Sequence, residues 1–123
     1  MSEIRATTIS DAAGTGPITL TKQSAAKAWV NLNGEGTIAI RNSLNTSSII
    51  DLNTGNYAQA FTSNFDATDN YASHSTADDE SFGNKTTINS QTGSQVSMQV
   101  FQGSSNTGVD TYRAMMTHHG DLA

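Results

Sequence analysis

The chain has 123 residues, a mass of 13.0 kDa, a formal net charge of −5 at pH 7 and a sequence pI near 4.8. An acidic chain lacks the basic footprint that phosphate binding requires, so we expect no nucleic acid partner. No apolar run approaches the roughly 20 residues of a membrane span, so we expect no membrane partner either.

Only 35% of the residues are hydrophobic and 14% are charged, against a usual charged share of about 25%. Neutral polar residues, mainly Ser, Thr and Asn, fill the difference and favour strands and turns over helices. The chain has no cysteine, so disulfides cannot supplement a thin hydrophobic core. Association with further copies is the remaining remedy. The composition therefore predicts a small all-β protein that forms an oligomer.

The N-terminal segment, Met1 to Thr21, is predicted to form an extended arm. Gly14, Gly16 and the single proline, Pro17, make this segment hard to pack alone. A partly disordered leader is the alternative. Its sparse aliphatic side chains are the candidates for contact with neighbouring chains: Ile4, Ile9, Ile18 and Leu20. Residues 22–123 are then the β domain.

A β-hairpin is predicted over Ala28 to Arg41. Alternation along 28–32 places Ala28, Val30 and Leu32 on one face, with Trp29 and Asn31 on the other. The Asn-Gly pair at 33–34 favours a tight turn because both residue types tolerate positive φ. The sequence "TIAIR" then supplies the return strand, with two isoleucines on one face.

A second strand pair is predicted to follow directly. It consists of a strand over Ser47–Leu52, a turn over Asn53–Asn56 and a return strand over Tyr57–Phe61. Tyr57 and Phe61 share a face with Gln59 between them, so one aromatic end of this ladder is expected to contact water.

The second half is less regular. Residues 62–84 are predicted to be a long acidic loop with at most one short strand near Tyr71, followed by a strand around 86–89. The segment "SQVSMQVFQG" alternates clearly, with Val96, Met98 and Val100 inward. The tail beyond Gly108 is read as either a last strand or a short helix. Together these segments predict an antiparallel β-sandwich or a barrel-like domain.

No group of residues points to catalysis, a cofactor or a metal. His118 and His119 are adjacent and would face opposite sides of a strand, and solvated histidines near a chain end are the expected state. The acidic run Asp78–Glu80 lacks the ligand spacing of a calcium loop, which leaves a weak cation site as a minor alternative. There is no Gly-x-Ser-x-Gly elbow and no phosphate loop. We therefore expect no enzyme.

Aromatic residues at strand spacing offer one binding alternative. Exposed rings on a β surface stack on sugars, so Trp29 and Tyr57 are candidates for stacking on a glycan. Rings at such spacing are more often buried in a core or a subunit contact, and that interpretation is favoured here.

The stretch "AAGTGPITLTKQSAAKAWVNLNGEGTIAIRNSLNTSSIIDLNTGNYAQAF", Ala12 to Phe61, resembles a module of tail fibre and head fibre proteins of tailed bacteriophages, and its matching residues lie within Ala26 to Phe61. The opening "MSEIRATTISDAAGTGP" is also similar to the start of such proteins. The module's pattern is close to "AKAWVNFNGTGT" followed by "IR-S-N-SSI-D-GTG-Y". After Phe61 the chain departs from the module, although "VSMQVF" resembles its closing strand.

This resemblance implies a non-catalytic structural component of the virion, often a homotrimer. The expected role is a tail fibre, head fibre or capsid-decorating subunit that contacts other virion proteins of the capsid or tail and acts in assembly or host attachment. The arm would then attach the unit to the particle or to sister subunits. The alternative is a carbohydrate-binding adhesion module that recognises a host-surface glycan.

Overall fold

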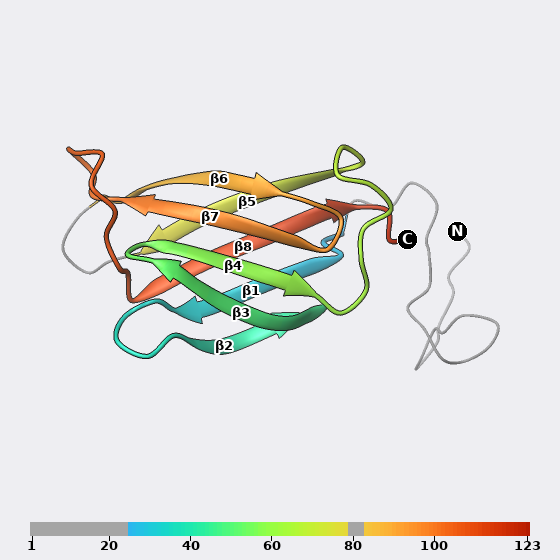
Figure 1. Cartoon of the computed structure of the whole chain (residues 1–123), viewed down its shortest axis with the longest axis horizontal. Coiled ribbons are helices and arrows are strands. Elements are labelled where there is room, and N and C mark those ends of the chain that lie inside the picture. The colour runs from blue at the N-terminus through green and yellow to red at the C-terminus, as the bar shows by residue number, and fades with distance from the viewer. Residues whose placement is uncertain (1–24, 79–82) are drawn as a thin grey trace, which may run out of the picture.

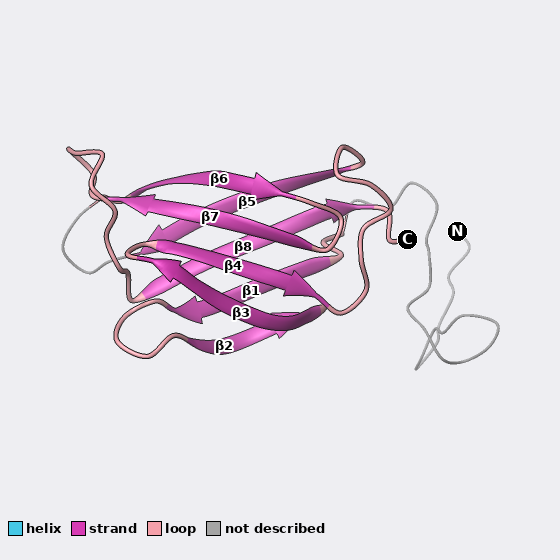
Figure 2. Ribbon diagram, viewed as in Figure 1, coloured by secondary structure: helices cyan, strands magenta, loops and turns pink. Residues whose placement is uncertain are grey.

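The computed structural model describes residues 25–78 and 83–123. These residues form two four-stranded antiparallel sheets, which Figures 1 and 2 show as two layers of crossing arrows. The predicted antiparallel β-sandwich is confirmed, and the sheets do not close into a barrel. The strands are β1 (Ala28–Asn33), β2 (Ala39–Leu44), β3 (Thr46–Asn53), β4 (Asn56–Phe61), β5 (Tyr71–Asp78), β6 (Lys85–Gln91), β7 (Gln95–Phe101) and β8 (Arg113–Gly120).

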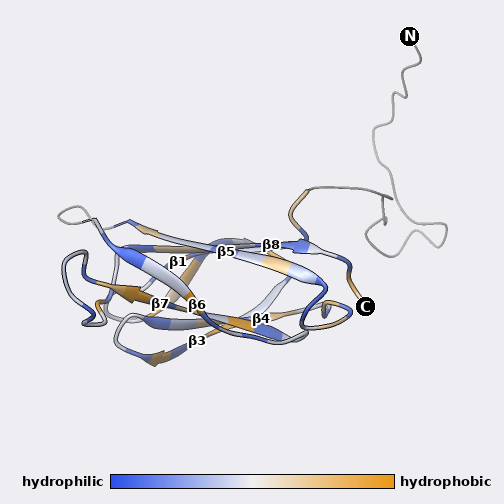
Figure 3. Cartoon of the chain, turned by 90° about the horizontal axis from the view of Figure 1, so that it is seen from above, coloured by the Kyte–Doolittle hydropathy of each residue, from blue (hydrophilic) through white to orange (hydrophobic). Residues whose placement is uncertain are grey.

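The first sheet has the strand order β2-β1-β8-β5, and the second has the order β3-β4-β7-β6. Figure 3 shows the two sheets from above, as two layers that face one another. Strand β8 lies in the middle of the first sheet, between β1 and β5, so the strands nearest the two ends of the described chain pair directly. The open question about the tail is settled in favour of a strand. No helix in the described parts of the chain is long and apolar enough to cross a membrane.

Side chains that alternate along the central strands form one continuous core. Strand β1 buries Ala28, Val30 and Leu32 and turns Trp29 and Asn31 outward, as predicted. The inward prediction for β7 is also confirmed. Complete burial of such a side chain contributes about 1.5–3 kcal/mol. The core cluster comprises Ala28, Val30, Leu32, Tyr57, Phe61, Phe65, Tyr71, Val96, Met98, Val100, Ala114 and Met116.

Aromatic rings fill one end of this core. Phe65 stacks on Tyr71 with ring centroids 4.0 Å apart and 14° between the ring planes. Phe61 meets the edge of this pair, 5.0 Å from the Phe65 centroid. Gln59, Tyr57 and Phe61 are all buried, so the expectation of a wet aromatic end on β4 is wrong. The opposing sheet covers both ends of that strand.

Strand β5 is longer than predicted. It runs over eight residues, where at most a short strand near Tyr71 was expected. Its inward positions include Ser73 and Ser75, while His74 and Thr76 face outward. Polar side chains on both faces conceal the alternation that normally marks a strand.

The first hairpin turns later than the Asn33–Gly34 pair suggests. Positive φ occurs at Gly36, with a φ of 63°, and not at residues 33 or 34. Gly34 is required for space instead, because an added Cβ would overlap the Tyr57 ring and its hydroxyl and lie 2.9 Å from the Thr111 carbonyl oxygen. The second turn lies where it was predicted, with Gly55 at a φ of 70°.

The predicted arm and its four contact residues, Ile4, Ile9, Ile18 and Leu20, lie outside the described residues. The acidic run is described only up to Asp78. The predicted arm and cation site therefore remain predictions.

Candidate functional site

The two candidate stacking residues lie in opposite environments. Tyr57 is completely buried, so the prediction that its ring stacks on a glycan is wrong. Its hydroxyl is 3.0 Å from the Gly34 carbonyl oxygen and 3.1 Å from Asp110 Oδ1. Burial, reinforced by the Asp110 charge, raises the pKa of Tyr57 well above its usual value. This tyrosine ties the first turn to the segment before β8 and is structural.

Trp29 lies on the outer face of the first sheet and is half-buried. It pairs with Leu44 on one side and with Thr117 on the other, and His74 pairs with Thr117 from β5. These side chains therefore form a row across the sheet's outer surface. A shallow hollow of about 190 Å³ opens in the same surface and is lined by His74, Ser75, Thr76, Met115, Thr117 and His119. Trp29 is adjacent to one wall of this hollow.

The adjacent histidines occupy opposite faces of β8, as predicted, but only His119 is exposed. His118 points into the core with an exposed fraction of 0%, so the expectation of solvated histidines is wrong for this residue. Burial, with a smaller contribution from His119, lowers the pKa of His118 from 6.5 to about 4. His118 is therefore neutral at pH 7.

A chain of side-chain hydrogen bonds holds the His118 imidazole. Nε2 is 3.0 Å from Gln59 Oε1, Nδ1 is 2.9 Å from Ser73 Oγ, and that hydroxyl donates to Gln91 Oε1 at 2.6 Å. The amide oxygens only accept, so the three links need three protons, while a neutral imidazole and one hydroxyl supply two. Turning the Gln59 amide over supplies the missing proton at Nε2, because its NH₂ group then donates there. Its oxygen then accepts from the Thr46 hydroxyl, which gives up its longer contacts to the Trp29 and Leu44 carbonyl oxygens. Neutral His118 then carries its proton on Nδ1.

Metal binding finds no support in the geometry of the described residues. No group of three or more His, Cys, Asp or Glu side chains among them is arranged to hold an ion. The hollow on the first sheet brings His74 and His119 to one surface, but its other lining residues are Ser, Thr and Met. What the hollow offers a ligand is polar contact beside an indole ring.

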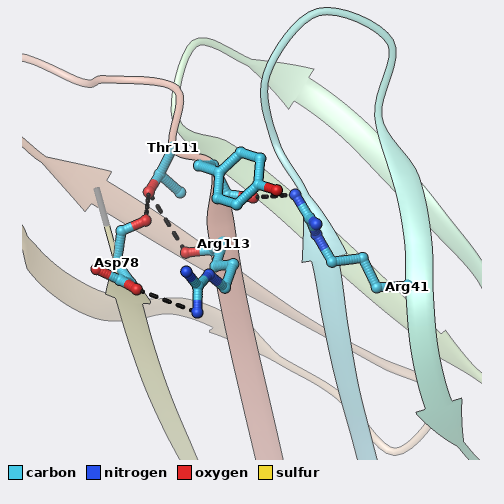
Figure 4. A network of polar contacts seen from close by, with 5 residues as sticks. Arg41, Asp78, Thr111 and Arg113 are labelled. Carbon is cyan, nitrogen blue, oxygen red and sulfur yellow. Dashed lines mark hydrogen bonds and ion pairs between the residues drawn. The ribbon is translucent and has the colours of Figure 1, made fainter. Parts of the chain in front are cut away.

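A polar network fixes the segment before β8 to the neighbouring strands (Figure 4). Arg41 of β2 donates to the Tyr112 carbonyl oxygen at 2.8 Å, and its guanidinium carbon lies 4.1 Å from the centroid of the same tyrosine ring. Thr111 Oγ1 donates to the Asp78 carbonyl oxygen at 2.9 Å, and the Asp78 carboxylate pairs with Arg113 at 3.5 Å. Because these contacts join β2, β5 and β8, they hold one end of the first sheet together.

The exposed large hydrophobic residues lie on or beside two neighbouring edge strands, with Leu44 on the outer face of the first sheet and Ile50 on the outer face of the second. Within the described residues they have exposed fractions between 39% and 48%. Two lie on β2, two lie on β3, and the fifth is the tyrosine that contacts Arg41 of β2: Ile40, Leu44, Ile50, Leu52 and Tyr112. Strands β2 and β3 are the edges of their sheets and lie next to one another (Figure 1). We call this surface the β2–β3 side.

Sequence reasoning did not identify the β2–β3 side. The alternation in "TIAIR" indicates a strand with one apolar face, and an apolar face is normally read as core. Ile40 is nevertheless 41% exposed, because β2 is an edge strand and its inner face is only partly covered. Strand order decides this point, and a single sequence does not contain it.

No protein-family model matches this chain, and neither the curated proteins nor the solved structures contain a match.

Proposed function

We propose that this chain is a non-enzymatic structural protein of a bacteriophage virion, acting as a tail fibre, head fibre or capsid-decorating subunit. Two things support the proposal: the resemblance over Ala26–Phe61, which spans β1 to β4, and the apolar β2–β3 side. The second observation carries it, because a small acidic protein with a polar surface elsewhere gains from covering such a side with another chain. Its partners are sister copies, as a homotrimer, and other proteins of the capsid or tail.

The free energy gained by burying the exposed side chains can be compared with the free energy that association costs. Ile40, Leu44, Ile50 and Leu52 each have a little less than half of their surface left to bury, which is worth about 1 kcal/mol per side chain. The sum of about 4 kcal/mol only reaches the lower end of the roughly 4–15 kcal/mol that association costs. Hydrogen bonds along the free strand edges and contacts by the N-terminal arm must therefore contribute as well.

The proposal is tested on purified phage particles and on the isolated protein. Antibodies against the β domain should label intact particles at a fixed location, which electron microscopy would reveal. In solution the protein should have a mass that is a multiple of 13.0 kDa. A well-folded monomer that is absent from particles would refute the proposal. Leu44→Lys should cause loss of assembly. Thr87→Lys, at an exposed position on β6 away from the β2–β3 side, is the control.

A carbohydrate-binding adhesion module is the second candidate, and one observation favours it. Trp29 lies on the outer face of the first sheet beside a hollow whose walls carry His and Thr side chains. An aromatic ring next to polar groups is the arrangement that stacks on a sugar and binds its hydroxyls. The ligand would be a host-surface glycan.

Glycan-array binding tests this second candidate. The wild type should bind at least one glycan, and Trp29→Ala should abolish that binding. Tyr112→Ala removes an exposed ring on a different surface and should leave binding unchanged. Absence of any bound glycan, or equal binding by the Trp29 variant, would eliminate this function.

A further inference from the structure

The first sheet has two edges, β2 and β5, and they differ in how they are covered. At the opposite side of the sandwich, β5 is joined to β6 by side-chain hydrogen bonds: Thr86 Oγ1 donates to the Ser75 carbonyl oxygen at 2.9 Å, and Ser73 Oγ donates to Gln91 Oε1 at 2.6 Å. That side carries no large exposed hydrophobic residue among those described. The two sheets therefore close over one another there, whereas they do not at β2.

The inner face of β2 is incompletely covered. Ile40 pairs directly with Leu32, so the two side chains lie on the same face of the sheet. Leu32 is 0% exposed, while Ile40 is 41% exposed. An apolar position on the inner face thus contacts water, because none of the described strands lies beyond β2. One additional strand with an apolar inner face would cover it.

The chain itself contains a segment suited to this position. The described residues begin at Ala25, shortly before β1, and residues 1–24 precede them in the chain. Within that segment, the sequence "PITLT" at 17–21 alternates, with Ile18 and Leu20 at positions that share one face of a strand. Pro17 lacks an N–H and is tolerated at the first residue of an edge strand.

We propose that residues 17–21 of a neighbouring copy add as an antiparallel strand to the free edge of β2, with Ile18 and Leu20 over Ile40. This inference rests on the proposed assembly function and names the surface that the N-terminal arm occupies. The added strand would supply backbone hydrogen bonds to the edge, which is the contribution that burial of the exposed side chains does not provide.

Chain length favours the neighbouring copy over the segment's own domain. All strand pairs in this fold are antiparallel, and an arm antiparallel to β2 runs in the same direction as β1. The arm would then end level with the far end of β1, about 20 Å along the strands and about 10 Å across two strand spacings from where β1 begins. The link from Thr21 to Ala28 spans at most about 24 Å when fully extended, which leaves no slack for passing around β2. A neighbouring copy has no such limit.

Engineered cysteines test this arrangement cleanly, because the chain has none of its own. Thr19→Cys and Asn42→Cys are made as separate proteins, mixed in equal amounts and oxidised under mild conditions. Asn42 is exposed on β2 and faces outward, as Thr19 should on the added strand. Thr21→Cys replaces Thr19→Cys in a parallel mixture to allow for a register shift of two residues. Thr87→Cys on β6 replaces Asn42→Cys as the control.

Mass spectrometry of the digested mixture measures the disulfide between arm and β2, which in this mixture forms only between molecules. We expect at least about tenfold more of it than of the disulfide to the Thr87→Cys control, since docking raises the local concentration. Equal yields, with the protein still an oligomer, would overturn the arm's docking on β2 and leave the proposed function standing. A folded monomeric wild type that is also absent from particles would instead refute the proposed function.

The double variant Thr19→Cys/Asn42→Cys separates the two sources of the arm. If it forms the disulfide within one chain while the mixture of single variants forms none, the arm covers its own domain, and the inference of a neighbouring copy is wrong. Circular dichroism of each variant verifies that the fold is intact.

Discussion

Protonation of His118 should destabilise the fold in a defined pH window. The pKa of this side chain is about 4 in the folded protein and 6.5 in the unfolded chain, because the folded core excludes water from the imidazole. The unfolded chain therefore takes up the proton first as the pH falls. The stabilisation by His118 is fully present above pH 6.5 and is lost progressively toward pH 4. Between pH 7.5 and 4.5 this loss amounts to roughly 2.5 kcal/mol of unfolding free energy.

Urea denaturation at the two pH values measures this effect, with His118→Gln as the variant that cannot be protonated. The wild type should lose roughly 2.5 kcal/mol more than the variant between pH 7.5 and pH 4.5. His119→Gln, a change at the exposed neighbour, should retain most of the wild-type pH dependence. Direct titration of the His118 imidazole by NMR gives an independent value. A His118 pKa near 6.5, or an equal loss in wild type and His118→Gln, would show that burial of His118 does not cause the pH dependence.

Further predictions concern backbone positions. Gly34→Ala should destabilise the protein by about 2–4 kcal/mol, because the new methyl group overlaps a buried tyrosine ring that cannot move away. Gly36→Ala has open space around it and should cost only about 1 kcal/mol, from the positive φ; equal losses in thermal denaturation would contradict this. Asn45→Ala should cost about 2 kcal/mol, because Asn45 has a φ of 54° and its side chain bonds both the N–H and the carbonyl of Ser63. Asn45→Gly should restore part of that loss, and a further loss would argue against the backbone explanation.

The strands that the sequence predicts well are those with one buried face. Along β1 and β7 the core side alternates with polar or half-buried positions, so a period of two is visible in the residues themselves. Strand β5 was underestimated because its inward Ser73 and Ser75 are as polar as its outward neighbours. Polar groups of β5 form hydrogen bonds with β6, and the sequence of β5 does not show that these partners exist.

The environments of individual side chains were harder to predict. His118 and His119 have the same local sequence context, yet His118 lies in the core and His119 is exposed. The difference depends on the position of β8 in the middle of its sheet, which the sequence does not show. Tyr57 was a candidate for an exposed ring, but the opposing sheet covers it. Ile40 lies on the inner face of its sheet but at an open edge, and only the strand order shows this. In each case the neighbour that decides the environment comes from a distant part of the chain.

The central claim is that further copies of this chain cover the β2–β3 side. Sedimentation equilibrium of the wild type and of the double variant Leu44→Lys/Ile50→Lys tests it most directly. We expect a wild-type mass that is a multiple of 13.0 kDa, threefold for the proposed trimer, and dissociation of the variant to folded single chains. A wild type that sediments as a single, cooperatively folded 13.0 kDa chain at every concentration would contradict it.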